Sequence, residues 1–194
     1  MELTVLDGPK GEIKLWKNVF SEEDLKEYHH FFLNKIDLYQ GQIRLFGKTY
    51  QKPRLEAFFH AMGKSYTYSN ETLKAHFFPP TLTRLRIQIE ELVGHTFNSA
   101  LVNVYRNGFD SNGWHADDEK ELGPNPIIGS VSFGSTRTFV LKHNTTKKTL
   151  RIPLCDGDVL WMGPSIQVEW KHCIPKQPKT TDPRINVTFR TLYE

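Results

Sequence analysis

Hydrophobic and polar residues follow different patterns in the two halves of the chain. From about Phe97 onward, short apolar runs alternate with clusters of Gly, Pro, Asn and Asp. This pattern predicts strands separated by turns, at residues 100–106, 127–133, 137–143, 149–154, 159–162, 168–172 and 184–192. Many short strands with this spacing are typical of a sandwich or a double-sheet jelly roll.

The residues before about position 95 mix helices with short strands. Ser21 precedes three acidic residues and predicts a helix start. A second helix is expected after Pro80, where leucine and isoleucine recur at helical spacing until Gly94 ends the pattern. A hairpin is expected at residues 43–48, with Gly47 in its turn. We therefore predict a mainly β fold with flanking helices.

Composition limits the kind of protein this is. The chain has 194 residues, 38% hydrophobic and 24% charged, as expected for one globular domain spanning 1–194. Its net charge of +3 permits a polyanionic partner without requiring one. Cys155 and Cys173 form no C-x-x-C pair, which favours a reducing, intracellular compartment. Neither a signal peptide nor an apolar run of about 20 residues is seen, so no membrane partner is expected.

Three residues form the strongest candidate for chemistry: His115, Asp117 and the distant His172. Side chains two apart on a strand share a face, so His115 and Asp117 can point at one ion. One carboxylate and two imidazoles form the facial triad that holds non-haem Fe(II). Hydrolytic zinc sites use the same ligands. Taken singly, each residue is more commonly an ordinary core or surface residue.

The last predicted strand carries Arg184, Asn186, Thr188 and Arg190 on one face, with apolar residues between them. A surface strand with a polar outer face is the simplest interpretation. Two arginines on one face also suit a dicarboxylate, because the guanidinium group pairs with carboxylates through two hydrogen bonds.

Several segments in order resemble the AlkB family of nucleic-acid dealkylating dioxygenases. The resemblance is strongest from Gly94 onward and looks closest to the second and third eukaryotic homologues and their bacterial cousins. The segments that carry it are residues 103–107 (NVYRN), 114–119 (WHADDE), 130–134 (SVSFG), 170–172 (WKH) and 184–190 (RINVTFR). The resemblance implies a double-stranded β-helix (jelly-roll) core at about 97–194 and an N-terminal nucleotide-recognition lid at about 40–80.

The resemblance also implies a cofactor site. His115, Asp117 and His172 would hold Fe(II), and open coordination positions would take O2 and the keto-acid end of the cosubstrate 2-oxoglutarate. Which arginine meets which carboxylate stays open, although Arg184 is expected at the distal one. The implied cosubstrate-binding residues are Asn103, Tyr105, Arg184, Asn186 and Arg190.

The implied reaction is oxidative demethylation of 1-methyladenine and 3-methylcytosine in DNA, and the choice between DNA and RNA stays open. It converts 2-oxoglutarate to succinate and releases formaldehyde, which amounts to direct-reversal alkylation repair. The target base must leave the duplex or be single-stranded. A cationic methylated base favours aromatic and carboxylate contacts. The implied substrate-binding residues are Phe46, Tyr66, Tyr68, Asp118 and Glu119.

Phe46 would fill the gap left by a flipped base, with Tyr68 stacking on the base opposite His115. Packing of Phe46 onto the core is an equal alternative. Phosphate contacts are expected from Arg44, Lys48, Lys52 and Arg54.

The chain departs from the family pattern at residues 58–63 (FFHAMG), where relatives usually carry Tyr-Gly. This departure leaves the shape of the lid and the strand preference open. Two other functions stay open: an oxygenase of the same fold acting on protein or lipid, and a non-catalytic binder of alkylated bases. Activity on a methylated oligonucleotide would distinguish them. We expect a monomer, in a bacterial cytoplasm or a eukaryotic nucleus or cytoplasm.

Overall fold

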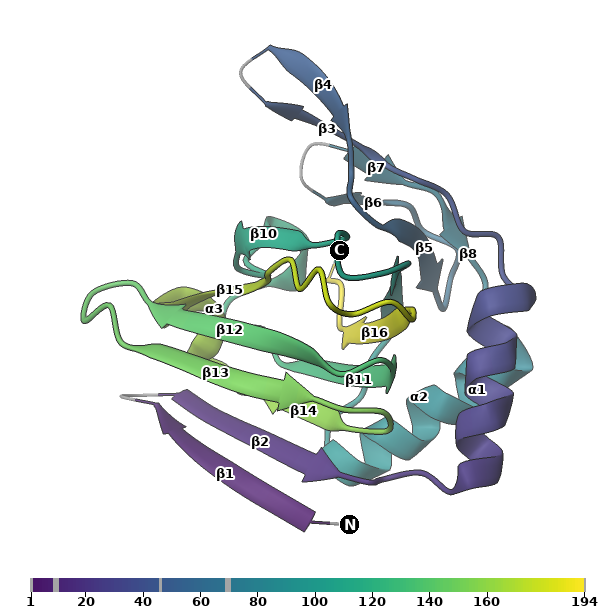
Figure 1. Ribbon diagram of the computed structural model, residues 1–194, viewed down its shortest axis with the longest axis horizontal. Helices are drawn as coiled ribbons and strands as arrows, with labels where there is room; N and C mark the ends of the chain where they lie inside the picture. The colour runs from purple at the N-terminus through teal and green to yellow at the C-terminus, as the bar shows by residue number, and fades with distance from the viewer. Residues whose placement is uncertain (1, 9–10, 46, 69–70, 194) are drawn as a thin grey trace.

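Two facing β-sheets form the body of the protein in a computed structural model that describes residues 2–8, 11–45, 47–68 and 71–193 (Figure 1). The larger sheet has eight strands in the order β1-β2-β14-β11-β16-β9-β5-β8. Their bounds are β1 Glu2–Gly8, β2 Gly11–Lys17, β14 Val159–Met162, β11 Ile128–Gly134, β16 Arg184–Arg190, β9 Ser99–Tyr105, β5 Leu55–His60 and β8 Ala75–His76. All neighbours are antiparallel except β5 and β8.

The smaller sheet has four antiparallel strands in the order β10-β15-β12-β13. They are β10 Asn112–His115, β15 Trp170–Ile174, β12 Arg137–His143 and β13 Thr149–Leu154. Two separate hairpins pair β3 (Gln42–Leu45) with β4 (Lys48–Gln51) and β6 (Tyr66–Tyr68) with β7 (Glu71–Leu73). The α-helices are α1 (Glu22–Asn34), α2 (Pro80–Val93) and the short α3 (Ile166–Glu169).

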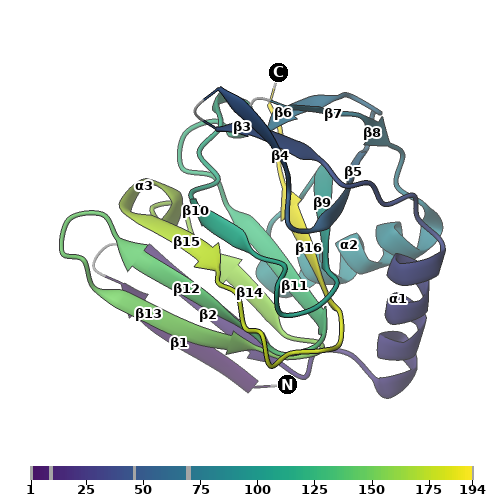
Figure 2. The same ribbon diagram turned by 45° about the horizontal axis from the view of Figure 1, so that its top comes forward.

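Apolar side chains form two layers on either side of the large sheet. Helices α1 and α2 cover its outer face (Figure 2), where Tyr28 and Leu85 pack with Phe133 and Phe189 of the sheet. The second layer lies between the two sheets and includes Leu141, Leu160 and Trp170. Burial of both faces explains why the strands of the large sheet are apolar in nearly continuous runs. This architecture confirms the predicted mainly β fold class.

The two long helices and the β3–β4 hairpin lie where the capping and turn residues of the sequence predicted them. The Ser21 hydroxyl accepts a hydrogen bond from the Asp24 N–H and caps α1. Gly94 adopts φ 69° and ends α2 in the left-handed conformation. Gly47 adopts φ 78° in the turn between β3 and β4. The strands expected at 137–143, 149–154 and 159–162 are confirmed.

Two parts of the prediction differ from the structure. The strand expected at 168–172 begins only at Trp170, because Ile166–Glu169 forms α3. Strands β1 and β2 were not predicted, although they extend the large sheet at one edge.

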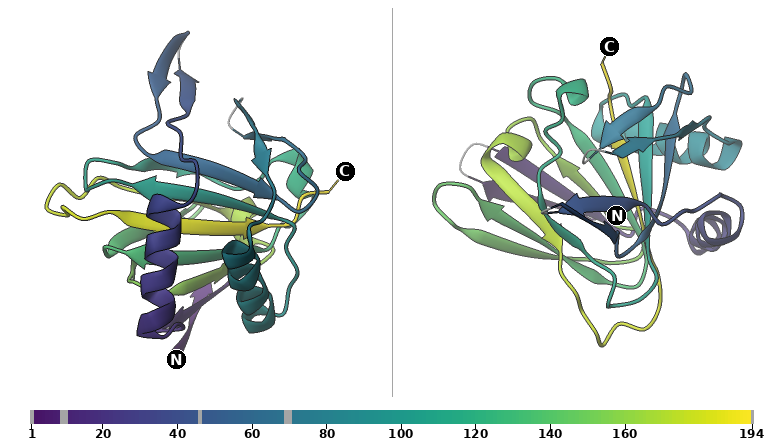
Figure 3. Two further views of the ribbon diagram at one scale, coloured as in Figure 1. Left: turned by 90° about the vertical axis from the view of Figure 1, so that its right-hand side faces the viewer. Right: turned by 90° about the horizontal axis from the view of Figure 1, so that it is seen from above.

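The segment expected to form the lid contains two hairpins and two strands of the large sheet, β5 and β8. Strand β5 lies in this range but pairs with β9 inside the large sheet, and Tyr39 bridges to Glu56 at its side. The hairpins β3–β4 and β6–β7 instead extend beyond the sheets at the same end of the molecule (Figure 3). The part of the range available to cover the cavity described below therefore consists of these two hairpins.

Candidate metal and cosubstrate site

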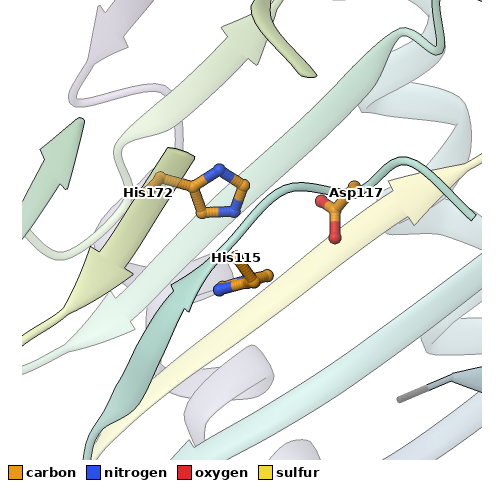
Figure 4. A group of neighbouring side chains, drawn as sticks. All are labelled: His115, Asp117 and His172. Atoms are coloured by element: carbon orange, nitrogen blue, oxygen red, sulfur yellow. The ribbon is translucent and has the colours of Figure 1, made fainter. Parts of the chain in front are cut away.

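His115, Asp117 and His172 lie close together (Figure 4) and line one cavity. His115 ends β10, Asp117 follows in the next loop, and His172 lies opposite His115 in the register of β10 and β15. One potential ligand atom from each lies within 4.8 Å of the others. The sheet register thus brings together two ligands 57 positions apart in the sequence.

Hydrogen bonds orient these ligands. His115 Nδ1 lies 2.7 Å from the carbonyl oxygen of Gly113, so Nδ1–H donates to that carbonyl. Nε2 of His115 therefore carries the lone pair, which accepts from Nδ2 of Asn112 over 3.3 Å and is the atom that would bind a metal ion. The backbone N–H of Asp117 donates to Oε1 of Gln167 over 2.9 Å. The His172 ring stacks on Phe139, with centroids 5.1 Å apart.

Burial and nearby charge set the protonation of the cluster. Burial lowers the pKa of His172 to about 3 and also lowers the pKa of His115. Burial would raise the pKa of Asp117, but Arg190, His172 and His115 outweigh it and lower the pKa to about 2. Nη2 of Arg190 donates to Oδ1 of Asp117 over 2.8 Å. Near neutral pH the cluster is one carboxylate and two neutral imidazoles, the states in which these groups bind metals.

Polar side chains of the large sheet face the same cavity. Asn103, Tyr105, Asn186 and Arg190 all line it together with the three-residue cluster. In the sheet, Asn186 lies opposite Asn103, and Arg184 opposite Tyr105. The guanidinium carbon of Arg184 is 5.3 Å from the Tyr105 ring centre. Four of the five predicted cosubstrate residues therefore line the cavity, and the fifth, Arg184, lies against the Tyr105 ring at the other end of β16 from Arg190.

Asn186 has a more limited role than its neighbours. Its Nδ2 donates both to Ser130 Oγ and to the Val131 carbonyl oxygen, and its Oδ1 accepts from Thr188 Oγ1. An amide nitrogen has two hydrogens, so Asn186 has no donor left for a carboxylate. It organises the polar face around the cavity.

Arg184 fits the cosubstrate best. The residue is 1% exposed, and burial lowers its pKa to about 10. Nη2 donates to Ser132 Oγ over 2.9 Å, whereas Nε and Nη1 have no acceptor among the described residues. A buried cation with two unused donors matches a carboxylate. The residues present therefore fit both a divalent metal ion and a dicarboxylate beside it.

The predicted substrate residues are only partly described. Phe46 lies outside the described residues. Tyr66 and Tyr68 belong to β6 by their backbone, and their side chains also lie outside the description. Asp118 is exposed and Glu119 half-buried, in the loop that continues from Asp117.

Two of the four expected phosphate contacts conflict with the structure. Lys52 is 2% exposed, and its Nζ lies 2.6 Å from Oε1 of the fully buried Glu56. Arg54 is buried as well, and its Nη2 lies 3.7 Å from Oε2 of Glu56. Their burial contradicts the prediction, because reaching a phosphate would leave the Glu56 carboxylate buried without them. Lys48 is exposed on β4, while for Arg44 only the backbone of β3 is described.

Three residues of the site were not predicted as such. Gln167 holds the Asp117 backbone, and Asn112 lies with its Nδ2 3.3 Å from Nε2 of His115. Arg54 connects Asn112 to Asn103 by donating to both. The sequence carried no signal for Gln167, which lies in the short helix where a strand was expected.

Comparison with known proteins agrees with this arrangement. Residues 12–190 match the model of the 2OG-Fe(II) oxygenase superfamily. The Mus musculus protein named DNA oxidative demethylase ALKBH2 is 37% identical over 199 residues, covering 98% of this chain and 79% of its own length. The Homo sapiens protein named alpha-ketoglutarate-dependent dioxygenase alkB homolog 3 is 44% identical over 155 residues, covering 75% of this chain and 54% of its own length.

The solved structure of OsALKBH1 has the same fold, with a TM-score of 0.70 over 98% of this chain and all of that one, at 16% identity. This chain spans about half the length of the alkB homolog 3 proteins that it matches. In the ranges that the structure describes, no helix combines the length and the apolar character needed to cross a membrane.

Proposed function

The chain belongs to the 2OG-Fe(II) oxygenase superfamily, as an AlkB homologue, and from this premise we propose that it oxidatively demethylates alkylated nucleobases. Its cofactor is Fe(II), with 2-oxoglutarate and O2 as cosubstrates. When bound, these supply the oxidation of an N-methyl group, so that the base is restored and formaldehyde, succinate and carbon dioxide are released. Family membership favours Fe(II) over hydrolytic zinc for the same three ligands.

The observation that carries the proposal is the cavity that the cluster shares with four of the cosubstrate residues, Asn103, Tyr105, Asn186 and Arg190. His115, Asp117 and His172 would hold the ion. Arg190 donates to Oδ1 of Asp117 and so keeps that carboxylate charged and oriented. Arg184 would bind the carboxylate of 2-oxoglutarate farther from the ion, using its Nε and Nη1 donors.

The substrate class rests on separate evidence. Relatives named DNA oxidative demethylase support a nucleic acid, and DNA in particular. A cationic base such as 3-methylcytosine would be favoured by the carboxylates of Asp118 and Glu119 beside the metal site. Hairpins β3–β4 and β6–β7, with Phe46, Tyr66 and Tyr68, would hold the base in the cavity. We place this activity inside the cell and expect the protein to act as a monomer.

Formaldehyde release from a panel of methylated oligonucleotides tests the proposal. The panel comprises 1-methyladenine and 3-methylcytosine in single- and double-stranded DNA and in RNA. We expect release that depends on both Fe(II) and 2-oxoglutarate with at least one DNA substrate. No release from any member, by protein that still binds Fe(II) and 2-oxoglutarate, would contradict the nucleobase assignment.

A further inference from the structure

A buried group of charges lies between the base of the β3–β4 hairpin and the cavity. Lys52, directly after β4, and Arg54 both contact Glu56 on β5. Glu56 is 0% exposed and lies opposite Asn103 in the register of β5 and β9. The hairpin base is fixed to the same segment, because the Lys52 N–H donates to the Gly41 carbonyl oxygen over 2.8 Å.

Burying three charged side chains costs folding free energy, so we expect these residues to contribute to the site. Taking charges out of water is unfavourable unless they are paired and hydrogen-bonded. Glu56 accepts from Lys52 over 2.6 Å and lies 3.7 Å from Nη2 of Arg54. Neither cation lines the cavity, so the group acts on it through the two asparagines that Arg54 contacts.

Arg54 determines how two amides are oriented. Its Nε donates to Oδ1 of Asn103 over 2.8 Å, and its Nη1 donates to Oδ1 of Asn112 over 3.1 Å. A guanidinium group only donates, so each amide must turn its oxygen toward Arg54. The NH2 group of each amide is then directed away from Arg54. Both asparagines line the cavity.

The consequences for the two amides differ. Asn103 keeps its two N–H donors for the cosubstrate side of the cavity. Asn112 presents its NH2 group to the metal side, 3.3 Å from Nε2 of His115. Without Arg54, either amide could rotate by half a turn and present an acceptor, which would repel a carboxylate.

We propose that Arg54 is a positioning residue that fixes the Asn103 and Asn112 amides as hydrogen-bond donors to bound 2-oxoglutarate. Glu56, with Lys52 as its second partner, holds the guanidinium in place for this role. The inference rests on the proposed function only in taking the cavity as the cosubstrate site. It replaces the phosphate contact expected for Arg54.

The test compares 2-oxoglutarate binding by Fe(II)-loaded protein without oxygen. Arg54→Lys keeps the charge but puts one nitrogen in place of the two, Nε and Nη1, that donate to the separate amides. We expect its affinity for 2-oxoglutarate to fall about 3- to 10-fold, the range for losing one buried hydrogen bond. Arg151→Lys, the same change at an exposed position on β13, is the matched control and should have the parent affinity.

A double-mutant cycle distinguishes a positioning role of Arg54 from a general destabilisation of the site. Asn103→Leu should weaken 2-oxoglutarate binding, and adding Arg54→Lys should weaken it further only by the part that passes through Asn112, so the double variant should bind more tightly than the product of the two single losses implies. Losses that multiply in full would overturn the proposal, because Arg54 would then act independently of Asn103. Unchanged affinity in Arg54→Lys with weaker oligonucleotide binding would also overturn it and restore the phosphate contact.

A spectroscopic signature tests the Asn112 side. The visible charge-transfer absorption of an Fe(II)–keto acid chelate responds to hydrogen bonds at the chelate, so it should shift in both Arg54→Lys and Asn112→Leu. An unchanged band in both would refute the role of Asn112. If Arg54→Lys fails to fold, Glu56→Gln takes its place, with the same expected direction. Parent protein that binds Fe(II) but no 2-oxoglutarate would instead refute the proposed function.

Discussion

Replacing Arg184 by methionine should weaken cosubstrate binding without weakening the fold. Burial lowers the pKa of Arg184 from 12.5 to about 10, which corresponds to a cost on the order of 3 kcal/mol for the buried charge. The variant loses the Ser132 hydrogen bond and the contact with the Tyr105 ring, each worth about 1 kcal/mol. The protein without cosubstrate should therefore gain roughly 1 kcal/mol, or about 2–4 °C in melting temperature.

Binding should change in the opposite direction. Two charge-assisted hydrogen bonds to a carboxylate are worth about 1.5–3 kcal/mol each, so the affinity for 2-oxoglutarate should fall at least about 100-fold. At a cosubstrate concentration of 100 times the parent Kd, the parent gains about 2.7 kcal/mol of stability and the variant about 0.4 kcal/mol. Calorimetric titration and thermal melts with and without 2-oxoglutarate measure both effects.

Arg184→Lys is the matched control for this experiment. It keeps the buried charge and its cost but loses the forked donors, so it should be less stable than Arg184→Met and also bind weakly. The reasoning is refuted if Arg184→Met binds 2-oxoglutarate within threefold of the parent while its free energy of unfolding falls by more than about 2 kcal/mol.

Three further predictions concern pH, substrate binding and packing. The pKa of His172 is about 3 in the folded protein and near 6.5 in the unfolded chain, so its contribution to stability is present above pH 6.5 and is lost as the pH falls. In urea unfolding of metal-free protein between pH 4 and 6, His172→Phe should reduce the slope of the unfolding free energy against pH by about one bound proton, and an unchanged slope would contradict this. Tyr68→Ala should weaken binding of a methylated oligonucleotide more than it slows uncoupled 2-oxoglutarate turnover, whereas equal losses would indicate a folding defect. Gly108→Ala should destabilise the protein by more than about 2 kcal/mol in chemical unfolding, because the added Cβ would overlap the Gln177 carbonyl oxygen. The added Cβ of Gly113→Ala meets open space, so this variant should lose about 1 kcal/mol or less, and similar losses for both variants would refute the packing argument.

The metal cluster could be predicted from the sequence because two of its residues are close together in the chain and are of types that bind metal ions. His115 and Asp117 are two residues apart, and they meet in the structure although β10 ends at His115 and Asp117 lies in the loop after it. The alternation in the last strand likewise placed Arg184 and Arg190 on one face. What no spacing could supply was the pairing of β10 with β15, which brings His172 opposite His115. The order of the motifs along the chain supplied that link.

The sequence did not predict that the charged residues Lys52 and Arg54 are buried. Lys52 and Arg54 follow a hairpin rich in exposed polar residues, so they were expected at the surface. The strand that begins at Leu55 enters the large sheet and draws both side chains inward toward Glu56. Strand β2 was not predicted, although its sequence mixes polar and apolar residues as strands do, and its place in the large sheet depends on pairing with a distant strand, β14.

The most direct test of the account measures formaldehyde and succinate together, using a 3-methylcytosine oligonucleotide. The parent protein should release one formaldehyde for each succinate formed, and Asp117→Ala should release neither, because the ion loses its carboxylate ligand. Formaldehyde release by Asp117→Ala at the parent rate would contradict the assignment of His115, Asp117 and His172 as the catalytic metal site.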